Sequence, residues 1–433
     1  MTPGEVAAIM FGTFGALIIL RVPVAFALGL ACVPVLALEE RLTPILLLTE
    51  TAKAYNAFIL LAVPFFLLAA NIMNASGITE RLMAFTRTIV GHFRGGLAQV
   101  NVVVSMIFAG ISGSSTADAA GEGSIIIPAM RREGYDASFS VAITACSSVM
   151  GVIIPPSILM VVWGGIMSVS IGGLFLAGFL PGILVGLSQM VAVHFYAKAR
   201  SYPVYPRATL REFGRTLGNA AAAMLSPVIV IGGVVGGFVT PTEASVLAVV
   251  WSALVGLFVY RSMTVRQVPT VLYETARLAS ISLFCIGTAS AFGWLLAYYR
   301  IPKAVVTWLA PFATGVTTAG FLMAFVFLVI GCFIDAVPAI IILGPLLEPL
   351  ATSVGMHPIH FAIIGVVSMA FGLVTPPYGL CLLIDCAIAR ITVREAIADV
   401  LIILIPMLVA LALIIMFPGA ILALPRLLMP KFV

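Results

Sequence analysis

The chain has 433 residues, of which 62% are hydrophobic and only 9% are charged. Soluble domains carry roughly 25% charged residues, so this composition excludes an ordinary soluble protein and indicates an all-α protein that crosses a membrane many times. The formal net charge of +5 does not indicate nucleic-acid binding, because the basic residues are confined to short segments between apolar stretches.

Apolar stretches of about 20 residues predict about ten spanning helices. The first stretch carries Glu5 and no basic segment before it, so we expect no cleaved signal peptide. The predicted spans cover residues 5–20, 23–38, 57–76, 138–168, 172–197, 219–239, 243–260, 278–298, 361–389 and 396–423.

An apolar run between Arg94 and Arg131 is interrupted by the sequence GISGSSTAD at residues 110–118. Each limb of this run would be only about 20 Å long as a helix, which is too short to cross a bilayer comfortably. Both outer ends carry arginine, so both are expected on the cytoplasmic side. We therefore predict a re-entrant helical hairpin at about 97–130, with a small polar tip at mid-membrane depth.

The most basic loop, residues 198–218, joins the two halves of the chain. A basic loop between spans lies on the cytoplasmic side by the positive-inside rule. We predict a first repeat at 1–197, a cytoplasmic linker at 198–218 and a second repeat at 219–433. The charged residues of the linker are Lys198, Arg200, Arg207, Arg211, Glu212 and Arg215.

One six-residue pattern occurs in both halves: GVIIPP at 151–156 returns as GLVTPP at 372–377, an offset of 221 residues. Proline has no N–H and crowds the carbonyl four residues before it, so each Pro-Pro pair breaks its helix. The freed carbonyls must face protein, water or an ion, because hydrocarbon cannot satisfy them. This predicts broken spanning helices at about 138–168 and 361–389, with a kink absorbed by helix packing as the alternative.

A second hairpin is expected at about 318–350, with its tip at residues 331–338. Gly331 follows Gly110 by the same 221 residues. No Lys or Arg occurs between Lys303 and Arg390, so this hairpin is expected to enter from the outside. The two halves are thus predicted to be inverted-topology repeats, an arrangement typical of carriers with a binding site near the bilayer midplane.

The tips and breaks carry the candidate chemistry. Ser112, Ser114, Ser115 and Thr116 place hydroxyl groups at the first tip, and hydroxyls and carbonyls are hard ligands suited to Na⁺. Helix packing through small residues is the alternative interpretation of this tip. Asp335, at the position that matches Ser114, is a functional hypothesis because a charge at membrane depth is costly. An interfacial Asp near the outer surface is its alternative.

Other polar residues have two interpretations. Asp118 and Glu122, one helical turn apart, either support the first hairpin internally or take part in the site. Glu243 either caps a helix or touches the second ion site, and Arg300 either attracts an anionic substrate or anchors a helix at the interface. Ser157 and Thr375 add hydroxyls beside the two breaks.

No motif for enzymatic chemistry is present: the sequence has no HExxH, no Walker A loop and no Ser/His/Asp grouping. The six cysteines lie in apolar surroundings without metal-ligand spacing, and we interpret them as small hydrophobic residues. The four histidines also lack acidic or cysteine partners for a metal site nearby. We predict that the protein is not an enzyme and has no organic cofactor.

The chain resembles the large membrane subunit of tripartite ATP-independent periplasmic (TRAP) transporters. This resemblance implies a multi-pass protein of a bacterial inner membrane, with elevator-type alternating access. The stretches that carry the resemblance are residues 64–73, 110–118 with 123–130, 151–157, 240–244 and 372–379.

The resemblance also implies what the protein moves. Its substrate would be a small organic acid such as a dicarboxylate, sugar acid or keto acid, co-transported with Na⁺. A periplasmic solute-binding protein would deliver the substrate, and a small four-helix membrane subunit, expected as a separate chain, would pack against this one.

The resemblance implies two sodium sites at the tips and breaks, with much of the ligation from backbone carbonyls. The second tip is apolar except for Asp335, which leaves its ion site less well defined than the first. The substrate would contact Ser115, Thr116, Ser157, Asp335 and Arg300. The first sodium site would use Ser112, Ser114, Gly151, Ile154 and Pro156, and the second Asp335, Gly372, Thr375 and Pro377.

Three other functions remain open at this point. A self-sufficient anion carrier coupled to Na⁺ or H⁺ would have a similar architecture and need no delivery protein. An ion channel would form its pore from the re-entrant tips, and saturable accumulation driven by an ion gradient would exclude it. A membrane enzyme is the remaining class, and it lacks candidate catalytic residues.

Overall fold

The computed structural model describes residues 1–39, 41–200 and 202–430, and every regular element within these ranges is a helix. The predicted class of an all-α polytopic membrane protein is confirmed. By length and composition, seven described helical segments can cross a membrane. They are Phe58–Ala75, Ile171–Arg200, Leu210–Val235, Pro241–Val259, Val265–Tyr298, Ala336–Ser353 and Val393–Met416.

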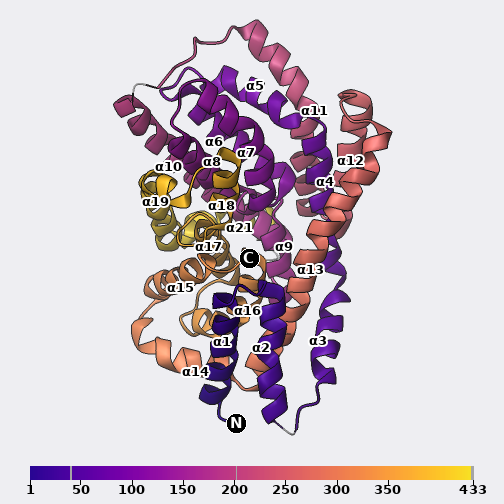
Figure 1. Ribbon diagram of the computed structural model, residues 1–433, viewed down its shortest axis with the longest axis vertical. Helices are drawn as coiled ribbons and strands as arrows, with labels where there is room; N and C mark the ends of the chain where they lie inside the picture. The colour runs from indigo at the N-terminus through magenta and orange to yellow at the C-terminus, as the bar shows by residue number, and fades with distance from the viewer. Residues whose placement is uncertain (40, 201, 431–433) are drawn as a thin grey trace.

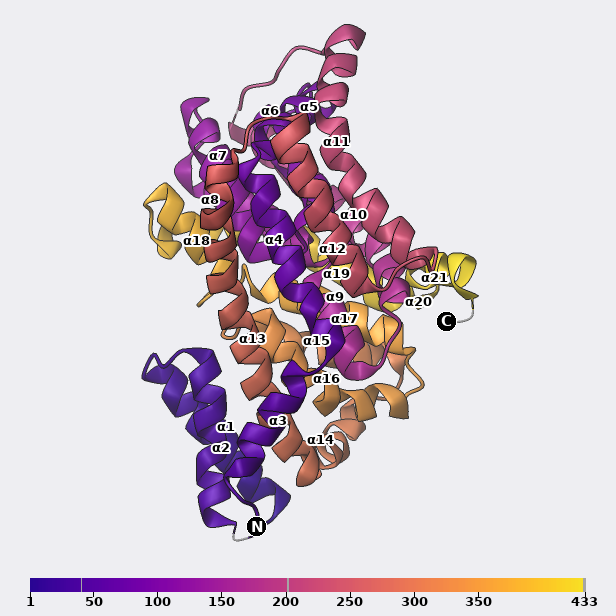
Figure 2. The same ribbon diagram turned by 90° about the vertical axis from the view of Figure 1, so that its right-hand side faces the viewer.

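One group of helices, which we call the frame, forms one side of the molecule (Figures 1 and 2). Within it α12 packs on α4 and α11, and α13 packs on α2, α3 and α4. The N-terminal helices lie at one end of the long axis, around the last turns of α13. The frame consists of α1 (Pro3–Ile19), α2 (Val24–Leu38), α3 (Ile45–Tyr55), α4 (Ala62–Ala75), α5 (Ile78–Val90), α11 (Leu210–Val235), α12 (Pro241–Leu254) and α13 (Val268–Tyr298).

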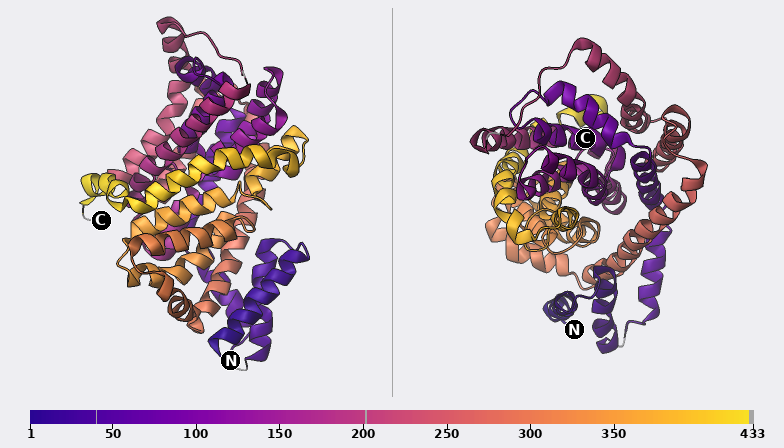
Figure 3. Two further views of the ribbon diagram at one scale, coloured as in Figure 1. Left: turned by 90° about the vertical axis from the view of Figure 1, so that its left-hand side faces the viewer. Right: turned by 45° about the horizontal axis from the view of Figure 1, so that its top comes forward.

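The second group, which we call the core group, interleaves the two halves of the chain. Helix α18 packs on α7, α19 packs on α8 and α10, and α15 and α16 pack on α17. Helix α19 runs obliquely across this group (Figure 3). The core group consists of α6 (Gly96–Ser112), α7 (Ser115–Arg132), α8 (Ala137–Ser148), α9 (Ile158–Met167), α10 (Ile171–Arg200), α15 (Val316–Gly331), α16 (Ala336–Ser353), α17 (Pro358–Gly372), α18 (Leu380–Ala389) and α19 (Val393–Met416).

Two helix pairs occupy the ranges predicted as hairpins. Helix α6 ends at Gly113, whose φ of 67° is a left-handed conformation that suits glycine, and Ser114 begins α7 as its N-cap. In the second pair, Asp335 is the N-cap of α16 and accepts a hydrogen bond from the Ala336 N–H at 2.9 Å. Ser114 and Asp335 therefore hold the same structural position, 221 residues apart.

Both Pro-Pro sequences interrupt a helix. Helix α8 continues through a 3₁₀ turn, η2 (Val149–Val152), and helical structure resumes only at α9. Helix α17 ends at Gly372, and α18 begins at Leu380. The Pro155–Pro156 and Pro376–Pro377 peptide bonds are both cis.

Several helices lie outside the predicted spans, and the loop between the halves is shorter than expected. Helices α3, α5 and α14 (Ile301–Leu309) cover ranges that were not predicted as spanning. Helix α10 continues to Arg200 and α11 begins at Leu210, so both extend into the linker predicted at 198–218. Charged residues indicate where a chain leaves the hydrocarbon, but a helix that satisfies its own backbone continues into water.

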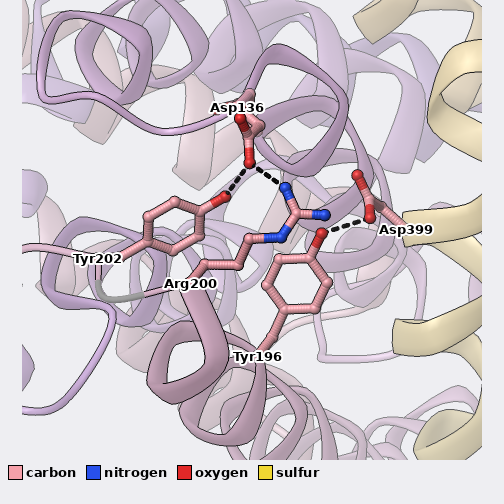
Figure 4. A network of polar contacts seen from close by, with 6 residues as sticks. Asp136, Tyr196, Arg200, Tyr202 and Asp399 are labelled. Atoms are coloured by element: carbon pink, nitrogen blue, oxygen red, sulfur yellow. Dashed lines mark hydrogen bonds and ion pairs between the residues drawn. The ribbon is translucent and has the colours of Figure 1, made fainter.

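The segment between α10 and α11, residues 202–209, is tied to the ends of core-group helices. Tyr202 donates its phenol to Asp136 at 2.6 Å, and Arg200 contacts the same carboxylate at 2.5 Å (Figure 4). Nearby, Tyr196 donates to Asp399 of α19 at 2.5 Å. We call residues 202–209 the connecting segment.

Candidate functional site

A cavity of about 550 Å³ lies where both hairpin tips and both helix breaks meet the frame. The tips contribute residues 113–117 and 335–337, and the breaks contribute residues on each side of the Pro-Pro pairs. The frame closes the cavity with one face of α4 and one of α13. The polar side chains in its wall are Asn71, Asn74, Ser114, Ser115, Thr116, Ser282 and Asp335.

The first tip gathers hydroxyl groups at the start of α7. Ser114 Oγ lies 3.2 Å from Thr116 Oγ1, and the Ser114 N–H donates to Ser112 Oγ at 3.4 Å. Ser115 is only 1% exposed, and its hydroxyl has no hydrogen-bond partner among the described residues. Buried hydroxyls normally have a partner, so this one is available to a ligand.

The first tip packs closely against the first break. The Ile158 N–H, after the Pro-Pro pair, donates to the Gly113 carbonyl at 3.1 Å. A Cβ on Gly151 would lie 3.0 Å from the Ser115 nitrogen and would overlap the Asp118 carboxylate. Only glycine fits at this position, because the backbone of one element reaches the backbone of the other.

The second tip and break meet in a similar way. A Cβ on Gly372 would lie 2.6 Å from Gly331 Cα, so this contact also needs glycine. The Cys381 N–H donates across the break to the Leu373 carbonyl at 3.0 Å. Thr375 donates its hydroxyl to the Phe371 carbonyl at 2.7 Å, within its own helix.

Three acidic side chains are buried behind the first tip. Asp118 and Glu122 of α7 and Asp385 of α18 have no exposed surface. Glu122 accepts a hydrogen bond from Ser105 Oγ at 2.6 Å, whereas both carboxyl oxygens of Asp118 and of Asp385 have no partner in the described part of the chain. Such groups must be protonated or matched by a cation, because burying an isolated charge is costly.

The predicted site residues fall into three sets. Ser114, Ser115, Thr116 and Asp335 line the cavity. A second set belongs to the same tips and breaks but lies behind the cavity wall. Its members are Ser112, Gly151, Ile154, Pro156, Ser157, Gly372, Thr375 and Pro377.

Ser157 and Arg300 do not lie where substrate contact would need them. The Ser157 hydroxyl donates to the Val152 carbonyl at 2.6 Å and accepts from the Met160 N–H at 3.3 Å, so it caps α9. Arg300 lies between α13 and α14 beside Lys303, in a separate surface hollow. Glu243 is part of a capping box with Thr240 at the start of α12, which is the simpler of its two interpretations.

Four polar residues of this region were not predicted. Asn71, Asn74 and Ser282 come from frame helices, and Asn71 donates its amide to Thr275 at 2.8 Å. Asp385 comes from the far side of the second break. Each is a polar residue inside an apolar helix, which is the signal that indicated Asp335.

The chain matches, over residues 11–420, the family described as "Tripartite ATP-independent periplasmic transporter, DctM component". It belongs to this family. The resemblance noted in the sequence is therefore confirmed, and the protein is a TRAP large permease: a multi-pass inner-membrane transport subunit and not an enzyme.

Relatives of this TRAP permease match over nearly its whole length. The sialic acid TRAP transporter large permease SiaM of Vibrio cholerae is 34% identical over 96% of this chain and 98% of its own. The C4-dicarboxylate TRAP transporter large permease DctM of Pseudomonas aeruginosa is 39% identical over 88% of each chain.

Among solved structures, the fold is similar to that of two other transporters. The YdaH transporter of Alcanivorax borkumensis matches with a TM-score of 0.57 at 14% identity, over 86% of this chain and 88% of that one. MtrF of Neisseria gonorrhoeae matches with a TM-score of 0.58 at 15% identity, over 86% and 84% respectively. At this identity the likeness concerns the fold alone.

Proposed function

We propose that this TRAP permease takes up a small organic acid with co-transported Na⁺. The cavity formed by both tips and both breaks carries the proposal, because broken helices beside a polar cavity at membrane depth are typical of ion-coupled carriers. The printed names of the relatives, which transport sialic acid or C4-dicarboxylates, favour an organic acid as the substrate.

The first sodium ion is proposed to bind between the first tip and the first break. Ser112 and Ser114 supply oxygens from the tip, and the close approach of Gly151 leaves its carbonyl region beside them. Ile154 and Pro156 would add backbone carbonyls. The Asp118 carboxylate lies against Gly151 and would supply the negative charge that a buried cation needs.

The second sodium ion is proposed to bind between the second tip and the second break. Asp335 supplies a carboxylate, and Gly372, Thr375 and Pro377 belong to the adjoining break. The Thr375 hydroxyl donates to a carbonyl within its own helix, which leaves the oxygen lone pairs free to ligate a cation.

Alternating access is proposed to follow movement of the core group against the frame. The two tips and two breaks, with the ion sites, belong to the core group, whereas α4 and α13 close the cavity from the frame. A rigid core group carrying its cargo past a fixed frame would expose the cavity to each side in turn. We also propose that the two halves are inverted repeats, in line with the matched positions of Ser114 and Asp335.

Two partners are proposed: a periplasmic solute-binding protein that delivers the substrate, and a small four-helix membrane subunit. The family description names one component of a three-part transporter, which supports two further components. No nucleic acid partner is proposed.

The test is uptake into proteoliposomes that hold this chain with its small subunit. Labelled organic acids would be offered under an inward Na⁺ gradient, with and without the binding protein. Uptake that requires both the gradient and the binding protein supports the proposal. Uptake that is indifferent to the binding protein would instead establish a self-sufficient carrier, and uptake without saturation would establish a channel.

A further inference from the structure

The wall of the central cavity is mostly aliphatic. Side chains from α4, α13 and α18 face one another across it, and the described residues that line it include no Lys, Arg or His. A charged substrate group that entered this wall without a polar partner would keep its full desolvation cost. The aliphatic residues from these helices are Val63, Leu67, Leu278, Ile281, Leu380 and Ile384.

One end of the cavity is suited to a carboxylate. The N–H groups of Ser115 and Thr116 begin α7 and have no acceptor within that helix. The partial positive charge of a helix N-terminus favours an anion there. The buried Ser115 hydroxyl, which has no partner among the described residues, lies in the same wall. Asp118, also in the first turn of α7, is turned toward Gly151 and does not line the cavity.

The opposite end is not suited to a second carboxylate. Asp335 caps α16 there, and its own carboxylate already accepts from the Ala336 N–H at 2.9 Å. Pro338 has no N–H, so the first turn of α16 has few donors left. A sodium ion at Asp335 would make this end neutral, and a neutral pair does not attract a second anion.

The helices after the two breaks also have their first donors occupied. Ile158 donates to Gly113, and Met160 donates to the Ser157 hydroxyl. Cys381 donates to Leu373. The cavity therefore holds one anion site, at the start of α7.

We infer that the substrate of this chain is a monocarboxylate whose remaining surface is mostly apolar, and that the cavity discriminates against dicarboxylates. This inference rests on the proposed function. The carboxylate binds at Ser115 and Thr116, and the apolar body lies against α13 and α18.

The test is a binding measurement by calorimetry on the purified complex of this chain with its small subunit. The binding protein is left out, because its own selectivity would mask that of the cavity. The probes are 4-methyl-2-oxopentanoate and phenylacetate as monocarboxylates, and succinate and fumarate as dicarboxylates, each in sodium and in choline buffer. We expect sodium-dependent binding of at least one monocarboxylate that is about tenfold or more tighter than that of either dicarboxylate.

Two other results would overturn the inference, and they differ in what else they remove. If succinate or fumarate binds in sodium as tightly as the monocarboxylates, the inference fails and the proposed function stands. If none of the four acids binds in sodium, the inference and the proposed function both fail.

Variants locate the carboxylate. Ser115→Ala removes a donor to a charged group and is expected to weaken monocarboxylate binding about tenfold. Ser124→Ala, on the exposed face of the same helix, is the matched control and should bind as the native protein does. Unchanged binding in Ser115→Ala would place the carboxylate elsewhere and overturn the assignment. If this variant does not fold, Thr116→Val tests the same site from the neighbouring residue.

Selectivity is tested by adding a cation to the wall. Ser282→Arg, on α13, places a positive charge where the apolar body is expected to lie. This variant should bind succinate more tightly than the native protein does and should lose affinity for the monocarboxylates. A succinate affinity that does not change would count against the lack of a second anion site as the cause of discrimination.

Discussion

At the scale of single residues, glycine decides how closely tip and break approach. Gly151 and Gly372, which hold matching positions in the two halves, each lie where a Cβ would meet backbone atoms of the adjoining tip. Backbone cannot move aside as a flexible side chain does, so a larger residue must separate the two elements. The oxygens proposed to bind Na⁺ come from both elements, and their spacing depends on these glycines.

We predict that Gly151→Leu abolishes uptake while the protein still inserts in the membrane. Overpacking costs about 1–3 kcal/mol and moves the first tip away from the break. Gly12→Leu is the control, because nothing lies within 4 Å of a Cβ at Gly12. The measurement is sodium-driven uptake together with the amount of protein in the membrane. Native uptake in Gly151→Leu would remove the first sodium site from consideration.

Asp335→Asn is expected to abolish uptake as well, for an electrostatic reason. The substitution keeps the size and the helix cap but removes the charge at the second tip, where a cation is proposed to bind. Glu274→Gln, on an exposed position of α13, is the matched control. The sodium dependence of uptake in the two variants would be compared, and equal dependence would contradict a role for the Asp335 charge.

At the scale of elements, the connecting segment is fixed to the ends of core-group helices by tyrosines. Tyr205 donates to Glu133, and its ring lies under the Arg87 guanidinium at 3.6 Å. Burial, followed by the hydrogen bond to Asp136, raises the pKa of Tyr202 above its ordinary value, and burial with the bond to Glu133 does the same for the pKa of Tyr205. Both phenols therefore stay protonated donors at physiological pH.

Removing both phenol groups should loosen this segment. Tyr202→Phe with Tyr205→Phe removes two partly exposed hydrogen bonds, worth about 1 kcal/mol together, which corresponds to a roughly fivefold larger open population. Trypsin cleavage after the exposed Arg207 should be faster by that factor in the solubilised protein. Tyr273→Phe, at an exposed position of α13, is the control, and an equal cleavage rate in all three proteins would show that the tyrosines do not hold the segment.

At the scale of the whole molecule, the frame and the core group meet along α4 and α7. Asn74 of the frame lies beside Gly121 of the core group, where a Cβ on Gly121 would be 3.1 Å from Asn74 Cγ. A disulfide at this point would join the two groups, because the side chains are within bridging distance. It would block any transport cycle in which the groups move past each other.

We predict that the pair Asn74→Cys and Gly121→Cys stops uptake when oxidised and that a reductant restores it. The control pair, Ser76→Cys with Gly256→Cys, lies wholly within the frame, where a Cβ on Gly256 would be 3.3 Å from Ser76 Cβ. Cross-linking this pair should leave uptake unchanged. Full uptake in the oxidised Asn74 and Gly121 pair would exclude movement between the groups.

Much of the architecture follows from local chemistry that a sequence displays directly. The Pro-Pro pairs end helices because proline lacks an N–H, and polar tips such as residues 110–118 interrupt apolar runs wherever the chain turns. The predicted hairpin and break ranges therefore lie close to the observed ends of α6, α7, α17 and α18. Each of these features depends on residues a few positions apart.

The wall of the cavity could not be predicted in the same way. Asn71, Ser282 and Asp385 are brought to the core of the molecule by packing between helices that are hundreds of residues apart in the chain. Arg300, the basic residue predicted to attract an anion, lies away from that cavity for the same reason. The sequence by itself determined the family, the helical breaks and the residues at each tip, because these depend on composition and short-range sterics. Tertiary packing alone decided which side chains face one another across the cavity.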